Sequence, residues 1–361
     1  MKKILICGLT ENYGGLEAYV MDLLLYSEKT RVQFDFLFWE NQIIPYLDYI
    51  EKGGGKCYFI PPLRRNPIAY YRGMRTIFDN NDYSAIYYQC NRRLTQLRVL
   101  KIAKKNGVKK VAVHSHNTRE EFPGIINKIR EIHVQLLFDS IVNTRLACSE
   151  RAGRWMFGKS PFTVIHNPID SERFRYNIVS RIKVRNELNI SKDELVVGTV
   201  GRLSHQKNPL FMIDVFKRLR MGKKAKFLHL GDGELRNDML GRISDEKLDR
   251  DYWLLGRRSN VEDYLSAMDV FILPSLYEGF PIALIEAQAN GLRCVVSNVI
   301  DRDCNIEGNV CFLSINKPPS EWAERIEKES VYIRHEEVGA SIKNKYDVAV
   351  VLKQVYDVFG M

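Results

Sequence analysis

The sequence has no paired-cysteine motif. Its seven cysteines are scattered along 361 residues, and none stands in a Cys-x-x-Cys pair. A disulfide framework needs an even number of cysteines, and structural zinc sites are typically built from closely spaced Cys-x-x-Cys pairs. The cysteine pattern therefore excludes both kinds of stabilisation and favours the reduced thiols of a cytosolic protein.

Long hydrophobic runs are also lacking. The apolar run that follows Lys2 and Lys3 ends after about five residues, which is too short for a signal peptide. No stretch approaches the ~20 apolar residues of a membrane-spanning helix. We therefore expect a cytoplasmic protein, with peripheral binding to the inner face of the cell membrane as an open alternative.

The loop after the first expected strand does not have the Gly-x-Gly-x-x-Gly spacing of dinucleotide-binding proteins. It runs from Cys7 to Glu17 and contains the adjacent pair Gly14 and Gly15 just before an amphipathic stretch. This argues against an NAD-dependent enzyme. The glycine pair is explained either by a plain strand-to-helix turn or by a loop whose amides face a ligand.

The sequence instead contains two blocks in which apolar, β-rich runs alternate with helical patterns, as in doubly wound α/β domains. The chain length also favours two domains. We predict an N-terminal domain over 1–170 and a C-terminal domain over 171–345, with a final helix over 346–361 that packs back on the first. Strands are expected at 3–7, 32–39, 56–60, 85–90, 110–116, 145–149, 163–166, 195–200, 226–230, 252–255, 269–274 and 293–298.

Polar residues that follow buried parallel strands are the best site candidates, because ligands bind beyond the carboxyl ends of such strands. Glu278 follows the strand at 269–274, and Glu286 lies about 7–8 Å along the helix that Pro281 is expected to begin. Two such carboxylates can accept hydrogen bonds from the hydroxyls of an extended ligand. For an isolated pair of glutamates, a solvent-facing Glu278 and a Glu286 that caps or forms a salt bridge are the commoner explanation.

Cations and glycines follow other strands of this half. Arg202 and Lys207 come after the strand at 195–200 and can bind phosphate by bidentate bonds and by point charge respectively. A basic surface loop is the alternative for these two. The turn Gly231-Asp232-Gly233 would allow the backbone to approach a ligand, and Arg257 with Val261 could border a nucleobase. Each of these two turns is weak evidence alone.

The motifs GTVGRLSHQKNP, FLHLGDGELR and YEGFPIALIEAQANGL, in this order, resemble glycosyltransferase family 4. This resemblance implies the GT-B fold, in which two Rossmann-like, doubly wound α/β domains face a central cleft. The sequence is similar in particular to enzymes of bacterial capsule and exopolysaccharide assembly. It implies transfer, with retention of configuration, of a hexose or N-acetylhexosamine from a nucleotide-diphosphate sugar, by preference a UDP-sugar, to a glycan or polyprenyl-diphosphate-linked acceptor.

The resemblance also assigns roles to individual residues. Glu286 would bind the ribose and Glu278 the donor sugar, while Arg202 and Lys207 would hold the diphosphate. His116, at the end of the strand at 110–116, would contact the sugar near the reacting carbon, although a lone histidine at a strand end is commonly structural. The residues expected to line the donor pocket are Gly14, Gly15, Gly231, Asp232, Gly233, Arg257, Val261, Gly279, Phe280, Pro281, Ile282 and Glu286.

No cofactor and no metal is expected, because the two cations already neutralise the diphosphate. An Asp-x-Asp sequence, Asp301 to Asp303, lies a strand beyond the sugar-site helix. A nucleotide-sugar 2-epimerase shares the two-domain architecture and stays open as an alternative, as does a non-catalytic binder of nucleotide sugars or polyanions.

The positive charge of the chain is concentrated in its first half. Residues 1–170 hold 25 Lys and Arg against 16 Asp and Glu, a net of +9, whereas residues 171–361 have a net of +1. Such asymmetry points to an anionic partner. No nucleic-acid recognition motif is present. A solvated helix face would explain the charge without a partner, and the preferred functional interpretation is an anionic membrane surface or a lipid-diphosphate acceptor.

Overall fold

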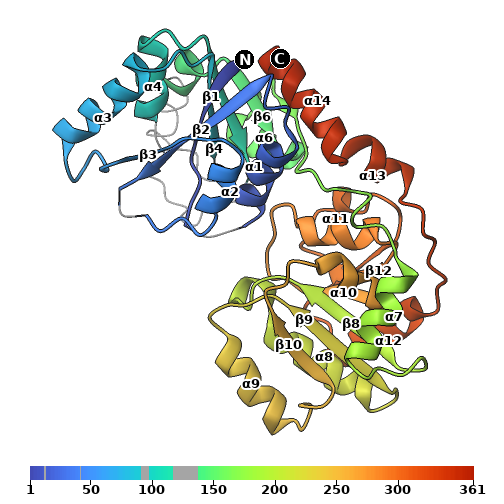
Figure 1. The fold of residues 1–361 in the computed structure, drawn as a ribbon. Coiled ribbons are helices and arrows are strands. Elements are labelled where there is room, and N and C mark those ends of the chain that lie inside the picture. The colour runs from blue at the N-terminus through green and yellow to red at the C-terminus, as the bar shows by residue number, and fades with distance from the viewer. Residues whose placement is uncertain (12–13, 41, 91–96, 117–136) are drawn as a thin grey trace. The chain divides into compact units, whose positions relative to one another are not determined.

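A computed structural model describes residues 1–11, 14–40, 42–90, 97–116 and 137–361 (Figure 1). The chain divides into two compact units. The first comprises Met1–Pro168 together with Val348–Met361, and the second comprises Ile169–Asp347. Each unit is an α/β body with its own parallel sheet. The expected boundary after residue 170 lies two residues beyond the observed division.

The first unit has a seven-stranded sheet in the order β3-β2-β1-β4-β5-β6-β7. All neighbouring strands pair in parallel. Chain order reverses between β1 and β4, and the loops beyond this switch point are where doubly wound sheets bind ligands. The strands are β1 Lys2–Cys7, β2 Val32–Trp39, β3 Cys57–Ile60, β4 Ala85–Cys90, β5 Lys110–Ser115, β6 Thr144–Ala147 and β7 Thr163–Val164.

The helices of the first unit include the end of the chain. Apolar residues of α14 join the same core as β1, β2 and α1, with Val351 and Val355 fully buried. Tyr87 of β4 also packs edge-on against Phe359, with ring centroids 5.0 Å apart. The C-terminal helix thus belongs to the first unit although the second unit precedes it. The helices that the structure describes in this unit are α1 Gly15–Tyr26, α2 Leu47–Lys52, α3 Pro67–Asp79, α4 Leu97–Lys105, α6 Glu150–Phe157 and α14 Val348–Phe359.

The second unit has a six-stranded parallel sheet in the order β10-β9-β8-β11-β12-β13. Its switch point falls between β8 and β11, so the loops that follow these two strands are neighbours. Sequence reasoning missed the edge strand β13. The strands are β8 Leu195–Val200, β9 Ala225–Leu230, β10 Tyr252–Gly256, β11 Val270–Leu273, β12 Arg293–Ser297 and β13 Val310–Leu313.

Helices cover the sheet of the second unit through two apolar clusters, which meet opposite faces of β8 and β11. Alternate residues of one strand, such as Val196 and Val197, belong to different clusters. The strands are therefore buried on both faces, as their continuous apolar sequence predicts. The helices are α7 Ile178–Glu187, α8 Pro209–Arg220, α9 Arg236–Asp245, α10 Val261–Ala267, α11 Ile282–Ala289, α12 Pro319–Ser330 and α13 Ala340–Lys345.

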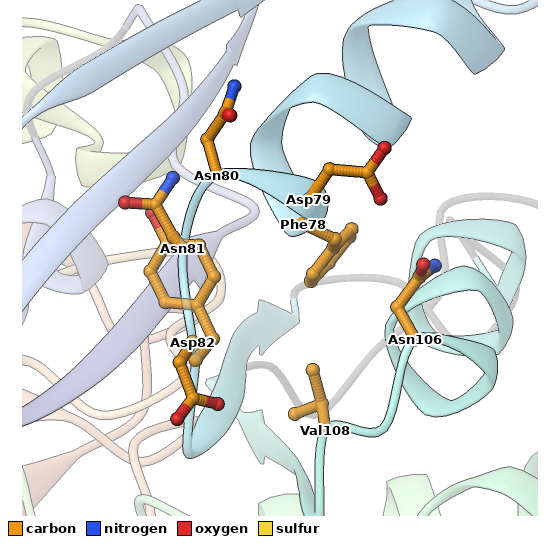
Figure 2. Close-up of a pocket in the computed structure, with 8 residues that line it drawn as sticks. Phe78, Asp79, Asn80, Asn81, Asp82, Asn106 and Val108 are labelled. Atoms are coloured by element: carbon orange, nitrogen blue, oxygen red, sulfur yellow. The ribbon is translucent and has the colours of Figure 1, made fainter.

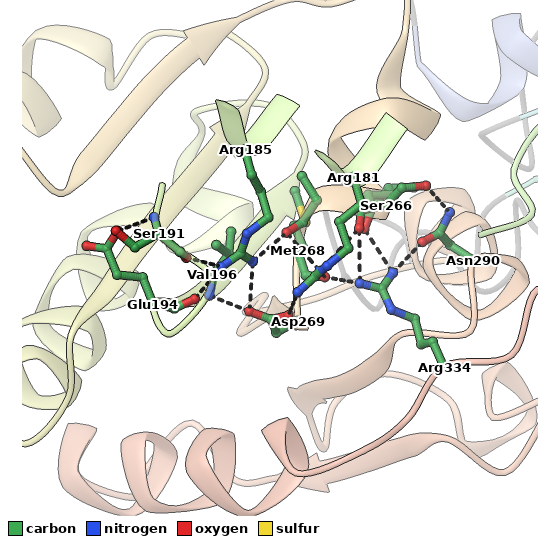
Figure 3. Close-up of polar contacts among 12 residues, drawn as sticks. Arg181, Arg185, Ser191, Glu194, Val196, Ser266, Met268, Asp269, Asn290 and Arg334 are labelled. Carbon is green, nitrogen blue, oxygen red and sulfur yellow. Dashed lines mark hydrogen bonds and ion pairs between the residues drawn. The ribbon is translucent and has the colours of Figure 1, made fainter. Parts of the chain in front are cut away.

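A polar cluster ties the helices to the edge of this sheet where its strands begin (Figure 3). Asp269, directly before β11, accepts from Arg181 of α7 at 2.6 Å and from the Val196 amide at 2.7 Å. Arg185 also reaches Asp269, at 3.3 Å. Arg334 donates to the carbonyls that end α10 and to Asn290, which caps α11. These bonds fix α7, α10 and α11 against the sheet.

Some sequence expectations need correction at their ends. The helix expected from residue 346 begins at Val348, because Tyr346 and Asp347 pair instead with the chain at Ile169. The strands expected at 163–166 and 269–274 are shorter, ending at Val164 and covering Val270–Leu273. The sequence also predicts a helix over 124–143, most of which falls on 117–136, outside the described residues. Among the residues that the structure describes, no helix has the length and apolar character needed to cross a bilayer.

Candidate nucleotide-sugar site

The loop after β8 is bound directly to the loop after β11. The Leu276 amide donates to the Gln206 carbonyl at 2.8 Å, and the Gln206 side chain donates to the Tyr277 carbonyl at 3.0 Å. Asn208 adds a bond to the Pro274 carbonyl at 3.3 Å. These hydrogen bonds fix the short 3₁₀ turn His205–Lys207 against the strand-to-helix loop that carries Glu278.

Lys207 and Glu278, which were predicted to bind different parts of the donor, form an ion pair. Lys207 Nζ lies 2.6 Å from Glu278 Oε1, and the side chains are only 16% and 6% exposed. The Lys207 methylenes pass over Gly201, where there is no side chain to block them. A charge pair this sheltered from water is strongly coupled, so a ligand that binds either member also acts on the other.

Arg202 is the cation of this site that remains available for an anion. Its side chain is exposed and makes no ion pair or hydrogen bond with the described residues. The backbone around it is held firmly, since the Leu203 amide donates to the Asp232 carbonyl at 3.1 Å and the Leu235 amide to the Leu203 carbonyl at 3.0 Å. A free guanidinium on a fixed loop can bind a phosphate without reorganising the backbone.

The two glycines of the Gly231-Asp232-Gly233 turn have a packing role that the sequence did not reveal. Gly231 has φ +132°, and a Cβ on it would lie 1.9 Å from the Gly201 carbonyl oxygen. A Cβ on Gly233 would lie 2.5 Å from the Leu203 carbonyl oxygen. Both glycines let this turn touch the Arg202 loop, and the ligand contact predicted for Asp232 remains a prediction.

The helix after Glu278 begins one residue later than expected. Pro281 precedes the first residue of α11, Ile282, and Glu286 is the fifth residue of the helix. Phe280 stacks on Tyr346 with centroids 5.8 Å apart and an interplanar angle of 9°, so its ring supports the core. Gly279 and Glu286 are half-buried on the same strand-to-helix segment. Their assignment to the donor stays a prediction.

The last donor-pocket candidates of this unit lie around the start of α10. Arg257 is exposed in the loop after β10, and Val261 is the first residue of α10. The neighbouring turn is held to the site by the Gly231 amide, which donates to the Gly256 carbonyl at 2.8 Å. The loops after β8, β9, β10 and β11 therefore form one connected group at the carboxyl edge of the sheet.

In the first unit, the glycine loop is held by an acid that sequence reasoning had not singled out. Glu17, only 3% exposed, accepts from the Thr10 amide at 3.0 Å, from the Thr10 hydroxyl at 2.8 Å and from the Gly14 amide at 3.0 Å. The Gly14 amide is therefore already bonded within the loop. Gly15 is the first residue of α1, whereas the glycine pair was expected to lie in the loop before the helix.

His116 follows β5 and lies beside β4. Its Nε2 is 2.8 Å from Gln89 Oε1, and its ring lies 4.2 Å from that of His114. Burial lowers the pKa of His116 to about 3, so the imidazole is neutral at physiological pH. The neighbouring Asn117 lies outside the described residues. A neutral imidazole here can accept or donate a hydrogen bond but cannot serve as a cation.

The remaining polar features do not suggest another site. Within the described ranges, no three His, Cys, Asp or Glu side chains are grouped to hold a metal. Asp301 caps a short turn by accepting from the Asp303 amide at 3.1 Å. A shallow cavity of about 330 Å³ lies at the opposite edge of the first sheet, where β4 and β5 begin (Figure 2). It is lined by Phe78–Tyr83, Asn106 and Val108, none of them a predicted site residue.

Comparison with known proteins shows similarity to one group of enzymes. Residues 180–329 match the family described as glycosyl transferases group 1. The putative glycosyltransferase EpsF of Bacillus subtilis is 31% identical over 325 residues, which cover 87% of this chain and 84% of that protein. The UDP-Gal:alpha-D-GlcNAc-diphosphoundecaprenol alpha-1,3-galactosyltransferase of Escherichia coli is 29% identical over 296 residues, covering 76% and 74%.

Solved structures share the fold. The crystal structure of Anabaena Alr3699/HepE in complex with UDP and glucose superposes with a TM-score of 0.77 over 100% of both chains, at 18% sequence identity. At this identity the likeness concerns architecture. The superposition covers both α/β units, including the C-terminal segment that belongs to the first unit.

Proposed function

Because the chain belongs to the glycosyl transferases group 1 family and has the GT-B fold, we propose that it transfers a hexose or N-acetylhexosamine from a UDP-sugar to a glycan or lipid-linked acceptor, with retention of configuration. The product would enter cell-surface polysaccharide. The observation that carries the proposal is the free Arg202 next to the coupled pair Lys207 and Glu278, on loops at the switch point of a parallel sheet.

The proposed chemistry uses this arrangement as follows. The bond between the sugar's anomeric carbon and the diphosphate breaks, and the acceptor oxygen forms the new bond to that carbon. The departing diphosphate keeps the bonding electrons and takes the acceptor's proton. Arg202 stabilises the negative charge that develops on the leaving group. Lys207, which is paired with Glu278, also binds the phosphates and stabilises this charge. Fixed charges aimed at developing charge are the largest contributors to such catalysis.

The same charges are the reason to propose that no metal is needed. Two cations at the diphosphate can do the neutralising work that Mg²⁺ does in other transferases. Turnover should therefore persist in excess EDTA. A loss of turnover that Mg²⁺ or Mn²⁺ restores would contradict this part of the proposal.

A panel of nucleotide sugars tests the donor. The related galactosyltransferase carries UDP-Gal in its name, and HepE binds UDP, which supports UDP over GDP or ADP. A donor at 100 times its Kd should add about 2.7 kcal/mol to the unfolding free energy. Thermal shifts with UDP-, GDP- and ADP-sugars should favour UDP, and mass spectrometry of the acceptor should then show one added sugar.

The epimerase alternative is not favoured, because the named relatives are glycosyltransferases. Incubation with donor alone separates the two activities. A transferase leaves the sugar's configuration unchanged apart from slow hydrolysis, whereas an epimerase converts it without any acceptor.

We also propose that α3 and α4 bind an anionic membrane surface. Exposed Ile68 and Tyr71 lie on α3, 73% and 49% exposed, and Arg98 of α4 lies 3.5 Å from the Tyr71 hydroxyl. Residues 61–110 hold 12 Lys and Arg against two Asp. Each basic residue near an anionic leaflet contributes about 1 kcal/mol. The diphosphoundecaprenol acceptor of the Escherichia coli relative is itself a lipid, which supports a membrane location.

Vesicle sedimentation tests the membrane surface independently of catalysis. The protein should pellet with vesicles that contain phosphatidylglycerol and stay in solution with pure phosphatidylcholine. A variant with Arg72→Ser and Arg75→Ser should bind anionic vesicles less, while Lys223→Ser with Lys224→Ser, on the second unit, should not. Equal binding by both variants would contradict the assignment to α3 and α4.

A further inference from the structure

Tyr346 of the second unit is a buried aromatic residue that the sequence did not mark as part of any site. It caps the end of α13, and its side chain is only 4% exposed. Its ring stacks on that of Phe280 with 5.8 Å between centroids and 9° between planes, within the range that aromatic pairs favour. Phe280 lies two residues after Glu278. The stack therefore joins the end of α13 to the strand-to-helix loop that carries Glu278, which we call the donor loop.

The backbone of Tyr346 lies where the chain passes between its two units. The chain leaves the first unit before Ile169 and returns to it after Asp347. The Ile169 amide donates to the Tyr346 carbonyl at 2.8 Å, and Ile169 forms a parallel bridge with Asp347. The Ser171 hydroxyl also donates to the Asp347 carboxylate. These four residues form what we call the chain crossing, and all of them belong to the second unit.

The first turn of α13 is bound to α11, the helix that follows the donor loop. Gln288 of α11 accepts from the Ile306 amide at 2.9 Å and from the Glu307 amide at 3.3 Å. Glu307 accepts in turn from the Ile342 amide of α13 at 2.7 Å. Gly339 leaves room for this carboxylate, because a Cβ there would lie 2.0 Å from Glu307 Oε2. Both ends of α13 are therefore held to the segment that contains the donor loop and α11.

The far end of α11 is bound close to the chain crossing as well. Asn290, which caps α11 and is fully buried, donates to the Phe174 carbonyl at 2.9 Å, three residues beyond Ser171. The donor loop, α11, α13 and the chain crossing thus form one continuous set of packed rings and hydrogen bonds. A displacement at one place in such a set is passed on, because a close-packed interior has little free space to absorb it.

We propose that Tyr346 is a positioning residue: its stack on Phe280 holds the donor loop in the conformation that binds the donor, and it couples donor binding to the rigidity of the chain crossing. The identity of the ligand, a nucleotide-diphosphate sugar, rests on the proposed function. The link between the donor loop and the crossing is a property of the free protein. The coupling is reciprocal, because a ligand that makes one place rigid binds more tightly when the linked place is already rigid.

Hydrogen exchange measured by mass spectrometry tests the link without any ligand. Phe280→Leu should speed exchange about 3- to 10-fold in peptides that contain Ile169, whose amide is bonded to the Tyr346 carbonyl. Tyr346→Leu should speed exchange to a similar extent in peptides that cover 276–284. Both substitutions keep the backbone carbonyls, so their effect passes through the rings. Tyr346→Phe keeps the ring and should exchange like the wild type in these peptides.

Tyr252→Leu is the matched control. Tyr252 is 3% exposed and stacks on Phe227 with 4.2 Å between centroids and 5° between planes, in the other apolar cluster of the same unit. Its loss should lower the stability of the second unit to a similar extent. Exchange at Ile169 and in the donor loop should then change no more than exchange in the rest of that unit.

UDP then tests the consequence for the donor. In the wild type, UDP should slow exchange in the peptides that contain Ile169. In Tyr346→Leu this slowing should be lost, and the Kd for UDP should rise about 3- to 10-fold. The kcat/KM for the donor should fall by a similar factor, and Tyr346→Phe should recover both values. A merely structural role would speed exchange equally with and without UDP.

The outcomes separate the two proposals. If no nucleotide sugar binds or is transferred but Phe280→Leu speeds exchange at Ile169 and Tyr346→Leu speeds exchange in the donor loop, the proposed function fails and the positioning stands. If these two substitutions change exchange there no more than Tyr252→Leu does, the positioning role is wrong. Equal slowing by UDP at Ile169 in the wild type and in Tyr346→Leu would overturn the coupling to donor binding.

Discussion

The pairing of Lys207 with Glu278 changes what a charge substitution should do. Glu278→Gln keeps the shape and one acceptor but leaves the sheltered ammonium without its counter-charge. We expect the unfolding free energy to fall by about 1–3 kcal/mol and kcat to fall by about 10²-fold because the fixed charges no longer complement the transition state. Urea unfolding and initial rates measure the two effects.

The control for this substitution is an exposed pair in the same unit. Asp214 and Arg242 are 2.8 Å apart with side chains 38% and 47% exposed, so Asp214→Asn should change stability by less than about 1 kcal/mol. Unchanged transfer rates in Glu278→Gln would show that the acid does not take part in the reaction.

Gly231 offers a second test at the residue scale. Gly231→Ala would strain a backbone at φ +132° and press a methyl group against the Gly201 carbonyl oxygen. We expect a stability loss on the order of 2–4 kcal/mol and weaker donor binding, because the loop of Arg202 must move. Thermal melts with and without donor measure both changes.

Gly241→Ala is the opposite case in the same unit. Gly241 lies within α9, and nothing stands within 4 Å of a Cβ placed there. Alanine should therefore stabilise the helix by about 0.5–1 kcal/mol. If both substitutions had the same effect, close packing of the Gly231 turn would not be the reason for its glycine.

Single residues also show where sequence reasoning reached its limit. The positions of Arg202, Lys207, Glu278 and Glu286 after strands could be predicted, because parallel sheets bring the loops at one edge together. The ion pair could not be predicted, since Lys207 and Glu278 are 71 positions apart and each had a role of its own. Tyr346 carried no signal, because it belongs to no motif and its contact with the donor loop is a tertiary one.

At the scale of elements, the sequence predicted the buried strands and most edge strands, but it missed one edge strand. The apolar runs of β2, β4 and β8 were placed with the bounds that the structure has. The edge strand β13 is only four residues long, and three of them are half-buried, so its pattern was indistinct. The C-terminal helix starts late because the backbone at Tyr346 and Asp347 pairs with Ile169, a tertiary contact that local propensity does not encode.

The arginine cluster gives a prediction for the elements of the second unit. Asp269→Asn would leave Arg181, Arg185 and Arg334 near one another without a neutralising carboxylate. Removing one member of a buried ion network costs on the order of 3–5 kcal/mol. The urea midpoint of the second unit should fall accordingly. Asp193→Asn, from an exposed pair with Lys224 at 3.5 Å, should have little effect.

A small effect of Asp269→Asn would mean that the arginines are held by backbone carbonyls alone. Arg334 in particular donates to the carbonyls of Leu265 and Ser266 as well as to Asn290. Hydrogen exchange of α7 and α10 in the variant distinguishes these cases, since faster exchange in both helices indicates that Asp269 couples them to the sheet.

At the scale of the whole molecule, buried histidines make both units sensitive to acid. Burial lowers the pKa of His116 and His229 to about 3 and that of His114 well below its usual range. In the unfolded chain these groups take up protons below about pH 6.5. Below that pH the unfolded state binds more protons than the folded state, so stability falls as the pH is lowered.

The sensitivity should be unequal, because His114 and His116 belong to the first unit and His229 to the second. Each histidine contributes a slope of up to about 1.4 kcal/mol per pH unit between about pH 6 and 5, above the range in which the carboxylates titrate. The first unit should therefore lose stability about twice as steeply as the second. Two of the four tryptophans, Trp253 and Trp322, lie in the second unit. In a variant that carries both Trp39→Phe and Trp155→Phe, tryptophan fluorescence during urea unfolding therefore follows the second unit alone. Circular dichroism follows both units. Identical slopes for the two units would mean that they unfold as one cooperative body or that the buried histidines of the first unit are protonated when folded.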